Sequence, residues 1–282
     1  MQTLKTKRAL RDVVRRARDV GQTIGFVPTM GYLHDGHLSL MRRARMENDL
    51  VVVSIFVNPT QFGPHEDLEA YPRNVQRDMD LMEAEKVDLV FLPDVEELYP
   101  PGYATFVELE GPITKVLCGA ARPIHFRGVA TIVAKFFNLV CPDRAYFGQK
   151  DAQQAAVIRQ MARDLDFKSQ IVVCPTVREA DGLAMSSRNA YLTPDQRADA
   201  VVISQSLAKA QEEVGRGQRD AAALIDMMTE RINSKPDAII DYIAVVDAQT
   251  LSRVETLRGE ILIAVAVQFG KSRLIDNIQI EV

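Results

Sequence analysis

Apolar residues fall into two kinds of segment over the first two thirds of the 282-residue chain. Short runs rich in β-branched residues, at 23–27 and 50–57, are typical of strands buried on both faces of a parallel sheet. Between these runs, apolar residues recur at helical spacing, at Leu38, Leu40, Met41 and Ala44. This order of strand, crossover helix and strand predicts an α/β fold with a Rossmann-like, doubly wound parallel sheet.

Segments of the same two kinds continue to about residue 177. The first helix, expected within 1–20, carries Leu10, Val13, Val14 and Ala17 on one face, which indicates a surface helix rather than a transit peptide. Further helices are expected at 36–49, 71–87, 113–119, 128–140 and from the turn at 148–151 to about 165, and strands at 88–92, 103–108, 144–147 and 171–177.

The periodicity changes after residue 177. Residues 181–189 follow no regular pattern, and Thr193 and Pro194 then have the residue types of a helix N-cap and first helical position. Helices are expected at 194–215 and 219–234, and strands at 239–246, 261–267 and 278–282. The chain therefore divides into a larger domain, 1–177, and a smaller α+β domain, 178–282.

Composition narrows the class of protein. Hydrophobic residues make up 47% of the chain and charged residues 26%, as in ordinary globular proteins, and no apolar run approaches the ~20 residues of a membrane helix. A net charge of −4 provides no basic field for a nucleic acid. The three scattered cysteines suggest no disulfide framework, so we expect a cytoplasmic protein that binds neither nucleic acid nor membrane.

The most informative stretch lies where the first buried strand meets its helix. Residues 26–37 read FVPTMGYLHDGH, which places Gly31 and Gly36 around a turn and His34 and His37 at the start of the helix. Glycine lets the backbone approach a ligand closely, and N–H groups at a helix start favour an anion. We interpret the stretch as a phosphate site.

A pair of histidines three residues apart also occurs as half of a metal site or on an exposed helix. A structural zinc site takes four Cys or His ligands, but the remaining histidines are only His65 and His125, and the cysteines form no close-spaced pair. The sequence therefore favours phosphate over metal at His34 and His37.

Two other turns follow expected strands at the edge where α/β sheets bind ligands. Gln61 comes just after the strand at 50–57, where a binding role and ordinary turn chemistry are equally compatible with the residues. Lys150 stands at a second strand-to-helix turn, where its charge can neutralise phosphate, and Gln154 follows one turn later.

Two groups of charged residues remain open between function and an exposed surface. Asp78 and Asp80 lie in the helix expected at 71–87, where Asp78 is a weak candidate for a Mg²⁺ ligand and a solvated face is the stronger alternative. Arg122, His125 and Arg127 form a basic turn that could meet an anion, but loops commonly expose such residues, so we assign them no catalytic role.

The glycine–histidine stretch resembles the HIGH-type signature of adenylate-forming nucleotidyltransferases, and VPTMGYLHDGH is similar to the pantothenate synthetase family in particular. The segments SIFVNPTQF (54–62), FGQKDAQQ (147–154) and DGLAMSSRN (181–189) are similar to that family's further motifs, in the same order. The resemblance covers nearly the whole chain.

This resemblance implies an ATP-dependent ligase that condenses pantoate with β-alanine through an enzyme-bound pantoyl adenylate, releasing AMP and pyrophosphate, with Mg²⁺ as cofactor and a homodimer as the assembly. Gln61 and Gln154 would bind pantoate and β-alanine, and His37, His34, Lys150 and Arg188 would be catalytic. The residues implied to bind ATP are Met30, Gly31, Tyr32, Leu33, His34, Asp35, Gly36, His37, Gly148, Gln149, Lys150, Asp151, Val177, Met185, Ser186, Ser187 and Arg188.

Two departures from the resembled pattern matter. Gln149 stands where that family commonly has Glu, and Arg188 serves where the related KMSKS-type loop has lysine. Adenylation requires positive groups because a carboxylate attacks an anionic phosphate, and donors preorganised in a dry site are worth ~3–4 kcal/mol each. The implied cations at 150 and 188 meet that requirement.

Two other functions share part of this signature. A tRNA-linked synthetase also has the histidine motif, although the acidic balance and small C-terminal part leave little surface for RNA. A non-catalytic nucleotide-sensing module would bind ATP without releasing pyrophosphate.

Overall fold

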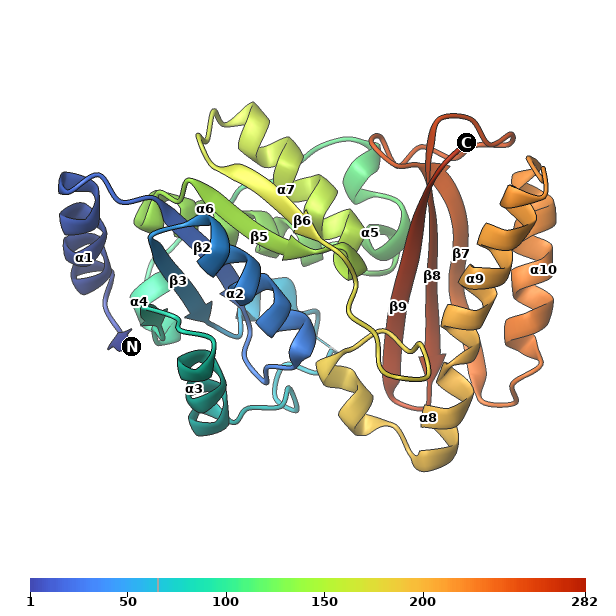
Figure 1. The fold of residues 1–282 in the computed structure, drawn as a ribbon, viewed down its shortest axis with the longest axis horizontal. Coiled ribbons are helices and arrows are strands. Elements are labelled where there is room, and N and C mark those ends of the chain that lie inside the picture. The colour runs from blue at the N-terminus through green and yellow to red at the C-terminus, as the bar shows by residue number, and fades with distance from the viewer. Residues whose placement is uncertain (65) are drawn as a thin grey trace. The chain divides into compact units, whose positions relative to one another are not determined.

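The computed structural model describes residues 1–64 and 66–282, so His65 lies outside the described residues. These residues form two compact units (Figure 1). The first unit comprises Met1–Glu110, Arg122–Gly148 and Gln154–Pro175, and the second comprises Gly111–Ala121, Gln149–Gln153 and Thr176–Val282. The second unit therefore includes two short segments from earlier in the chain.

The first unit is built on a six-stranded parallel sheet in the order β1-β4-β3-β2-β5-β6. Its strands are β1 (Gln2–Leu4), β2 (Ile24–Thr29), β3 (Leu50–Ile55), β4 (Leu89–Phe91), β5 (Arg144–Gly148) and β6 (Gln170–Cys174). From β2 the chain proceeds one way through β3 to β4, and β5 and β6 lie on the other side of β2. The order reverses between β2 and β5, and their carboxyl ends form the switch point where such sheets bind ligands.

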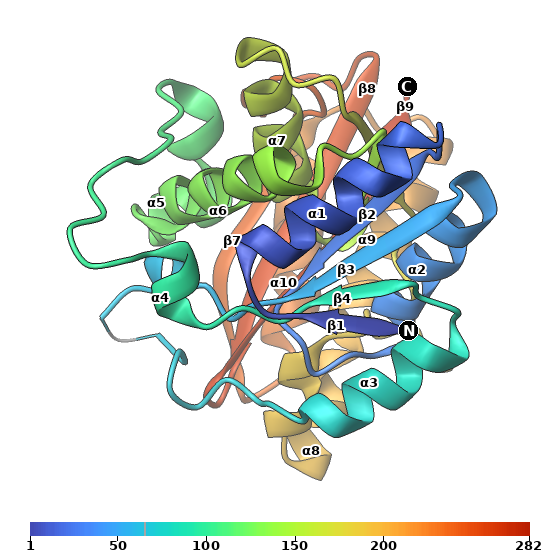
Figure 2. The same ribbon diagram turned by 90° about the vertical axis from the view of Figure 1, so that its left-hand side faces the viewer.

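Helices cover both faces of this sheet (Figure 2). Leu10, Phe26 and Phe136 belong to the core on one face, and Val27, Met41 and Met82 to the core on the other. The unit's α-helices are α1 (Lys7–Asp19), α2 (Asp35–Glu47), α3 (Val75–Ala84), α4 (Val95–Leu98), α6 (His125–Val140) and α7 (Ala152–Asp164), the last from Gln154 onward. The α/β class predicted from the apolar pattern is confirmed.

Two sequence expectations for this unit were wrong in detail. The chain begins with the edge strand β1 before α1, and no strand forms at 103–108. The N–H of Val107 donates instead to Oγ of Thr131 on α6, at 3.0 Å, and Phe106 lies under the guanidinium of Arg127. The alternation at 103–108 therefore reflects packing of an extended segment, without a neighbouring strand.

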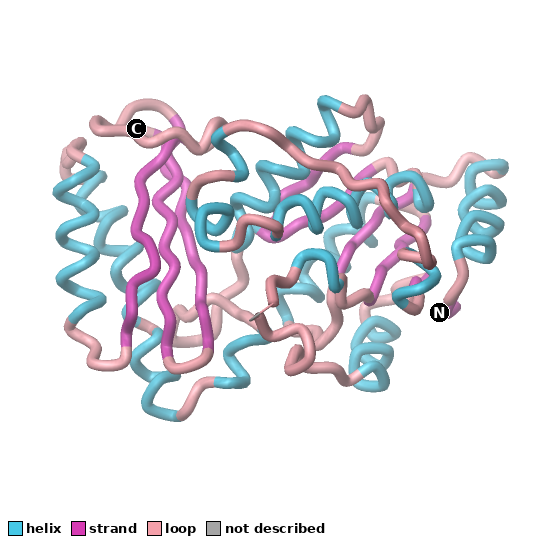
Figure 3. Tube along the Cα trace, turned by 180° about the vertical axis from the view of Figure 1, so that it is seen from behind, coloured by secondary structure: helices cyan, strands magenta, loops and turns pink. Residues whose placement is uncertain are grey.

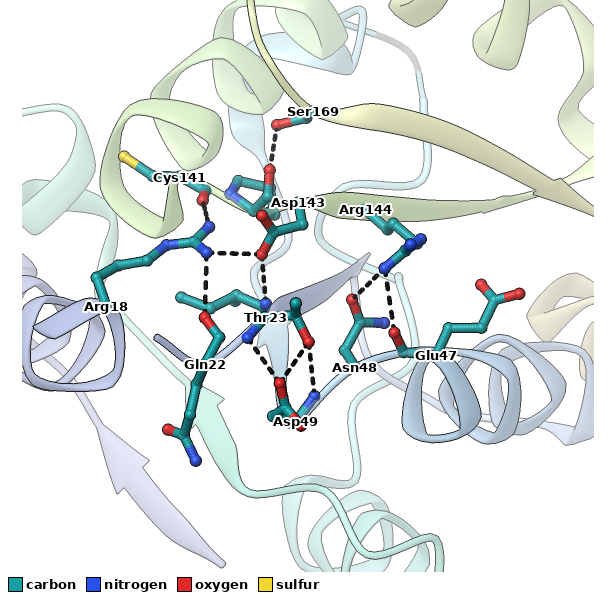
Figure 4. A network of polar contacts seen from close by, with 12 residues as sticks. Arg18, Gln22, Thr23, Glu47, Asn48, Asp49, Cys141, Asp143, Arg144 and Ser169 are labelled. Carbon is teal, nitrogen blue, oxygen red and sulfur yellow. Dashed lines mark hydrogen bonds and ion pairs between the residues drawn. The ribbon is translucent and has the colours of Figure 1, made fainter. Parts of the chain in front are cut away.

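A polar network joins the amino ends of the strands (Figure 4). Arg18 donates to the Asp143 carboxylate at 2.7 Å and to the Gln22 carbonyl, and Asp143 accepts the N–H of Ile24 at the start of β2. Asp49, just before β3, accepts from the N–H and hydroxyl of Thr23. These bonds align the strands at the edge opposite their carboxyl ends.

The second unit contains a three-stranded antiparallel sheet in the order β7-β8-β9, with helices beside it (Figure 3). The strands are β7 (Ala238–Asp247), β8 (Glu260–Phe269) and β9 (Ser272–Glu281), and the helices are α5 (Leu117–Ala121), α8 (Pro194–Ala200), α9 (Val202–Gly215) and α10 (Ala221–Asn233). β9 starts six residues before the predicted 278, because a tight turn at 270–271 joins it directly to β8.

The predicted helix 194–215 is divided into α8 and α9 at Val201. Its start is as predicted, since Thr193 caps α8 and Pro194 is the first helical residue. In the described part of the chain, no helix combines the length and apolar character needed to cross a membrane.

Candidate nucleotide and substrate site

His34 and His37 cap helix α2 reciprocally. His34 is the N-cap residue, and its Nδ1 accepts the N–H of Gly36 at 3.1 Å. Nδ1 of His37 accepts the N–H of His34 at 3.3 Å, and the ring centroids lie 4.1 Å apart. Because both Nδ1 atoms accept, each neutral ring carries its proton on Nε2. The helix cap thus selects a tautomer with an Nε2–H donor.

Space requires a glycine at both 31 and 36, and at Gly31 the backbone conformation requires it as well. A Cβ on Gly36 would lie 2.8 Å from Cε1 of His34, so any side chain there would displace the imidazole. Gly31 has φ +84°, and a Cβ there would lie 3.0 Å from Ile55 and 3.1 Å from Asp78. The absence of a side chain at both positions therefore lets the turn before α2 pack closely against its neighbours.

Asp78 holds this turn from helix α3. Its carboxylate oxygens accept the N–H groups of Tyr32 and Leu33, at 2.7 and 2.8 Å, and the residue is 1% exposed. Arg77 donates to the carbonyl of Leu33 at 2.9 Å. These bonds account for a buried carboxylate at this position without a metal ion. Among residues 1–64 and 66–282, no group of three His, Cys, Asp or Glu side chains could hold one.

Gln61 lies in the 3-10 helix η1 (Pro59–Gln61), beyond the carboxyl end of β3, and is 8% exposed. Nδ2 of Asn58 donates to the carbonyl of Gly128 at 3.1 Å and to Oε1 of Gln61 at 3.0 Å. Since a carbonyl can only accept, it fixes the orientation of the Asn58 amide, which in turn fixes that of Gln61. Gln61 is therefore held with its Nε2 as the donor end, 3.2 Å from Sδ of Met30.

The basic turn before α6 supports the backbone of Gln61. His125 Nδ1 lies 3.0 Å from the Gln61 carbonyl oxygen, and Arg122 forms an ion pair with Glu66 and contacts the same carbonyl at 3.4 Å. Burial alone would raise the pKa of Glu66, but Arg122 lowers it below its ordinary value. Arg122 and His125 thus have a structural role, but the exposed loop that the sequence favoured for them was wrong, since His125 is buried and Arg122 largely so.

The turn after β5 belongs to the second unit from Gln149 onward. Gly148 ends β5, and Gln149, Lys150 and Asp151 form the 3-10 helix η3 (Gln149–Asp151). The Lys150 ammonium lies 4.0 Å from the Asp151 carboxylate, a long ion pair. The amide of Gln149 donates to Oδ1 of Asn277 at 2.9 Å.

The loop that resembles the KMSKS-type segment has an ordered base. The N–H of Met185 donates to the carbonyl of Val177 at 3.0 Å, which brings these two predicted residues together. Ser186 caps the 3-10 helix η4 (Ser187–Tyr191) by accepting the N–H of Arg188. Hydrogen bonds from Arg197 to Asp181 fasten the same loop and lower the pKa of Asp181.

The candidate residues of each unit thus lie at or next to turns of that same unit. The first unit contains Met30 to His37, Gln61, Gly148 and Gln154, the last in the first turn of α7, and the second contains Gln149, Lys150, Asp151, Val177 and Met185 to Arg188. Sequence reasoning missed the turn-holding role of Asp78 and the partners Asn58 and Asn277. The Asn-Pro pair at 58–59 was a signal for the first of these partners.

The chain matches the family model described as pantoate-beta-alanine ligase over residues 2–279. It is 54% identical to a pantothenate synthetase from Acetivibrio thermocellus, over 100% of both chains. A pantothenate synthetase from Moorella thermoacetica is 56% identical over 100% of this chain and 99% of the relative.

Solved structures show the same similarity. The crystal structure of pantothenate synthetase from Thermus thermophilus has a TM-score of 0.94 and 48% identity, covering 99% of each chain. A pantoate-beta-alanine ligase from Francisella tularensis, described as complexed with beta-gamma ATP and beta-alanine, has a TM-score of 0.81 and 36% identity, covering 99% of this chain and 97% of that one.

Proposed function

Because the chain belongs to the pantoate–β-alanine ligase family, it is an enzyme that joins pantoate to β-alanine, and we propose that ATP drives the reaction through a pantoyl adenylate. AMP and pyrophosphate are the other products. The observation that carries the proposal is the reciprocal cap of α2 by His34 and His37, which leaves the ring proton of each histidine on Nε2. Both histidines follow β2, at the switch point of the sheet. The ATP-bound relative from F. tularensis supports ATP as the co-substrate.

His34 and His37 serve the phosphates as fixed donors. The pantoate carboxylate attacks the α-phosphorus, so negative charge increases on the phosphate oxygens as the transition state forms. An Nε2–H held in place by the cap stabilises that charge without reorganising. His37 has the closest role at the reacting phosphate. Met30, Gly31, Tyr32, Leu33, Asp35 and Gly36 complete this half of the proposed nucleotide-binding set.

Lys150 and Arg188 supply the positive charge that adenylation requires. The ion pair of Lys150 supports this role, since among the described residues its carboxylate partner, Asp151, is as far as 4.0 Å from the ammonium. Ser186 and Ser187 add hydroxyl donors beside Arg188. The backbone of the proposed site around these groups comes from Gly148, Gln149, Asp151, Val177 and Met185. Lys150 and Arg188 neutralise the negative charge that develops on the departing pyrophosphate.

Gln61 and Gln154 bind pantoate and β-alanine. The fixed amide of Gln61 supports this assignment, because Asn58 holds its Oε1 and leaves Nε2 as the donor end. A donor suits the carboxylate or hydroxyl oxygens of pantoate. β-Alanine then attacks the acyl carbon of the adenylate, and AMP leaves with the bridging oxygen.

We propose that Mg²⁺ is bound by the triphosphate of ATP. The described side chains offer no set of three ligands, and both oxygens of Asp78 hold backbone N–H groups, so the described residues do not form a resident metal site by themselves. Mg²⁺ is commonly bound by substrate phosphates with few protein ligands.

The remaining assignments rest on the family. We infer a nucleotide- and pantoate-binding domain at 1–177 and a C-terminal domain at 178–282 that carries the ATP-closing loop. We also infer a homodimer, and a cytoplasmic location, which three free cysteines support.

Pyrophosphate release tests the proposal. Enzyme with ATP, Mg²⁺ and pantoate should release about one equivalent of pyrophosphate per active site before β-alanine is added, because the adenylate stays bound. A panel of other acids and amines, including amino acids with tRNA, provides the control. Pyrophosphate release that strictly requires β-alanine would contradict the adenylate, and absence of release under all conditions would favour a nucleotide sensor.

A further inference from the structure

Strand β9 contains two adjacent polar residues that are buried. Asp276 is 3% exposed and Asn277 is 5% exposed. Successive residues of a strand point to opposite faces, so both faces of β9 are covered here by polar partners. Buried polar side chains require hydrogen bonds, and the partners of these two belong to the segments that carry Lys150 and Arg188.

Asn277 holds the turn that carries Lys150. Its Nδ2 donates to the carbonyl of Gln149 at 2.9 Å and to the carbonyl of Lys150 at 3.0 Å. Its Oδ1 accepts from Nε2 of Gln149 at 2.9 Å. The single amide of Asn277 therefore fixes both the backbone of η3 and the side chain beside Lys150.

The direction of these bonds explains the residue at 149. The two carbonyls can only accept, so Nδ2 of Asn277 must face them and its Oδ1 must face the side chain of Gln149. A glutamate at 149 would place a carboxylate against this oxygen. Asn277 in this chain therefore requires a donor at 149, which glutamine provides.

Asp276 holds the base of the loop that carries Arg188. Its carboxylate accepts from Nη1 and Nη2 of Arg178, at 2.6 and 3.0 Å, and Nη1 of Arg178 also donates to the carbonyl of Gly182 at 3.1 Å. At the start of the same strand, Oγ of Ser272 contacts the carbonyl of Arg188 at 3.3 Å. The loop is thus tied to β9 at two places.

We propose that Asp276 and Asn277 are positioning residues that hold Lys150 and the Arg188 loop in their working geometry. The inference rests on the proposed function, in which these cations neutralise phosphate. A displacement of about 1 Å at a catalytic group can cost about a hundredfold in rate. Loss of either anchor should therefore reduce kcat although neither residue carries a charge to the phosphates.

Asn277→Ala is the principal test. We expect kcat for pyrophosphate formation to fall at least about tenfold, with KM for pantoate little changed, in a variant that still unfolds cooperatively. Gln279→Ala is the matched control, because Gln279 lies two residues later on β9 with an exposed side chain, and its kcat should equal that of the parent.

The decisive comparison repeats Asn277→Ala in a Lys150→Ala background. If Asn277 acts through Lys150, its loss should have almost no further effect on kcat there. The same fold reduction in both backgrounds would overturn the inference while leaving the proposed function intact. No effect of Lys150→Ala by itself would contradict the proposed function, and the inference with it.

Two further variants keep the inference testable if Asn277→Ala does not fold. Gln149→Glu places a carboxylate oxygen against Oδ1 of Asn277. It should therefore lower kcat more than Gln149→Ala, which only removes the hydrogen bond. Asp276→Asn, compared in the parent and in an Arg188→Ala background, should reduce kcat only in the parent. A Gln149→Glu enzyme as active as the parent would contradict the proposed bond direction.

Discussion

Each imidazole at the start of α2 has two different nitrogen atoms with two different tasks. Nδ1 of His34 and of His37 accepts a backbone N–H and stabilises the helix start. Nε2 is then the protonated atom that can donate to phosphate. Helix stability and catalysis are therefore separable at one residue by amide side chains that imitate one nitrogen at a time.

His37→Asn and His37→Gln make this separation measurable. Asparagine places an acceptor near the position of Nδ1, so the cap and the thermal midpoint should be retained while kcat falls about a hundredfold. Glutamine places an amide near Nε2, so it should retain more activity but lose thermal stability. The kcat and melting temperature of both variants should give opposite rankings, and a variant that ranks higher in both would contradict the division of tasks.

Asp78 provides a second residue test, which distinguishes a turn-holding carboxylate from a Mg²⁺ ligand. Asp78→Asn leaves one backbone N–H poorly satisfied, which should cost about 1–3 kcal/mol of the free energy of unfolding. The Mg²⁺ concentration that gives half-maximal rate should not change, because Asp78 holds the turn at Tyr32 and Leu33. A large rise in that concentration, with stability intact, would restore the metal-ligand interpretation.

From the sequence, the chemical role of these residues could be predicted better than the partners that they contact. The histidines stood out because their spacing and glycines have a local physical meaning. The contact between Asn277 and Gln149 joins residues 128 positions apart, so no periodicity or turn pattern near either residue indicates it. Such partners emerge only when the strand order is known.

At the scale of elements, the apolar pattern predicted the type of segment well and its ends less well. The first buried strand was expected at 23–27, yet β2 continues through Pro28 to Thr29. β5 pairs with β2 only at Gly25 and Phe26, so Pro28 lies beyond the part of the strand that is bonded on both sides. The short edge strand β1 was missed because three residues are too few for a periodicity.

The contact between α6 and η1 depends on the glycine at 128. A Cβ there would lie 2.4 Å from the carbonyl oxygen of Thr60 and 2.6 Å from Cα of Gln61, both backbone atoms. Gly128→Ala should therefore move η1, raise KM for pantoate at least about tenfold and destabilise the fold by about 1–3 kcal/mol. KM for ATP should change much less, and an equal rise in both would argue against a pantoate role for Gln61.

At the scale of the molecule, the two edges of the six-stranded sheet have different tasks. The amino edge holds the Arg18, Asp143 and Asp49 network (Figure 4), whereas the carboxyl edge holds the histidine turn and η1. Damage to the amino edge should affect stability and leave the chemistry intact.

Arg18→Ala tests this division. It removes hydrogen bonds to Asp143 and to the Gln22 carbonyl, and should lower the free energy of unfolding by about 1–2 kcal/mol. The kcat and KM values of the folded enzyme should stay within about twofold of the parent. A loss of kcat with an unchanged denaturation midpoint would contradict the separation of the two edges.

The central claim is that pantoate is activated by its own carboxylate oxygen at the α-phosphorus of ATP. The most direct measurement uses pantoate labelled with ¹⁸O in both carboxylate oxygens, followed by mass spectrometry of the products after one turnover with β-alanine. The bridging oxygen of the adenylate leaves with AMP, so AMP should carry one labelled oxygen and pantothenate should retain the other in its new amide. Unlabelled AMP, or label in pyrophosphate, would contradict the adenylate mechanism proposed for His34, His37, Lys150 and Arg188.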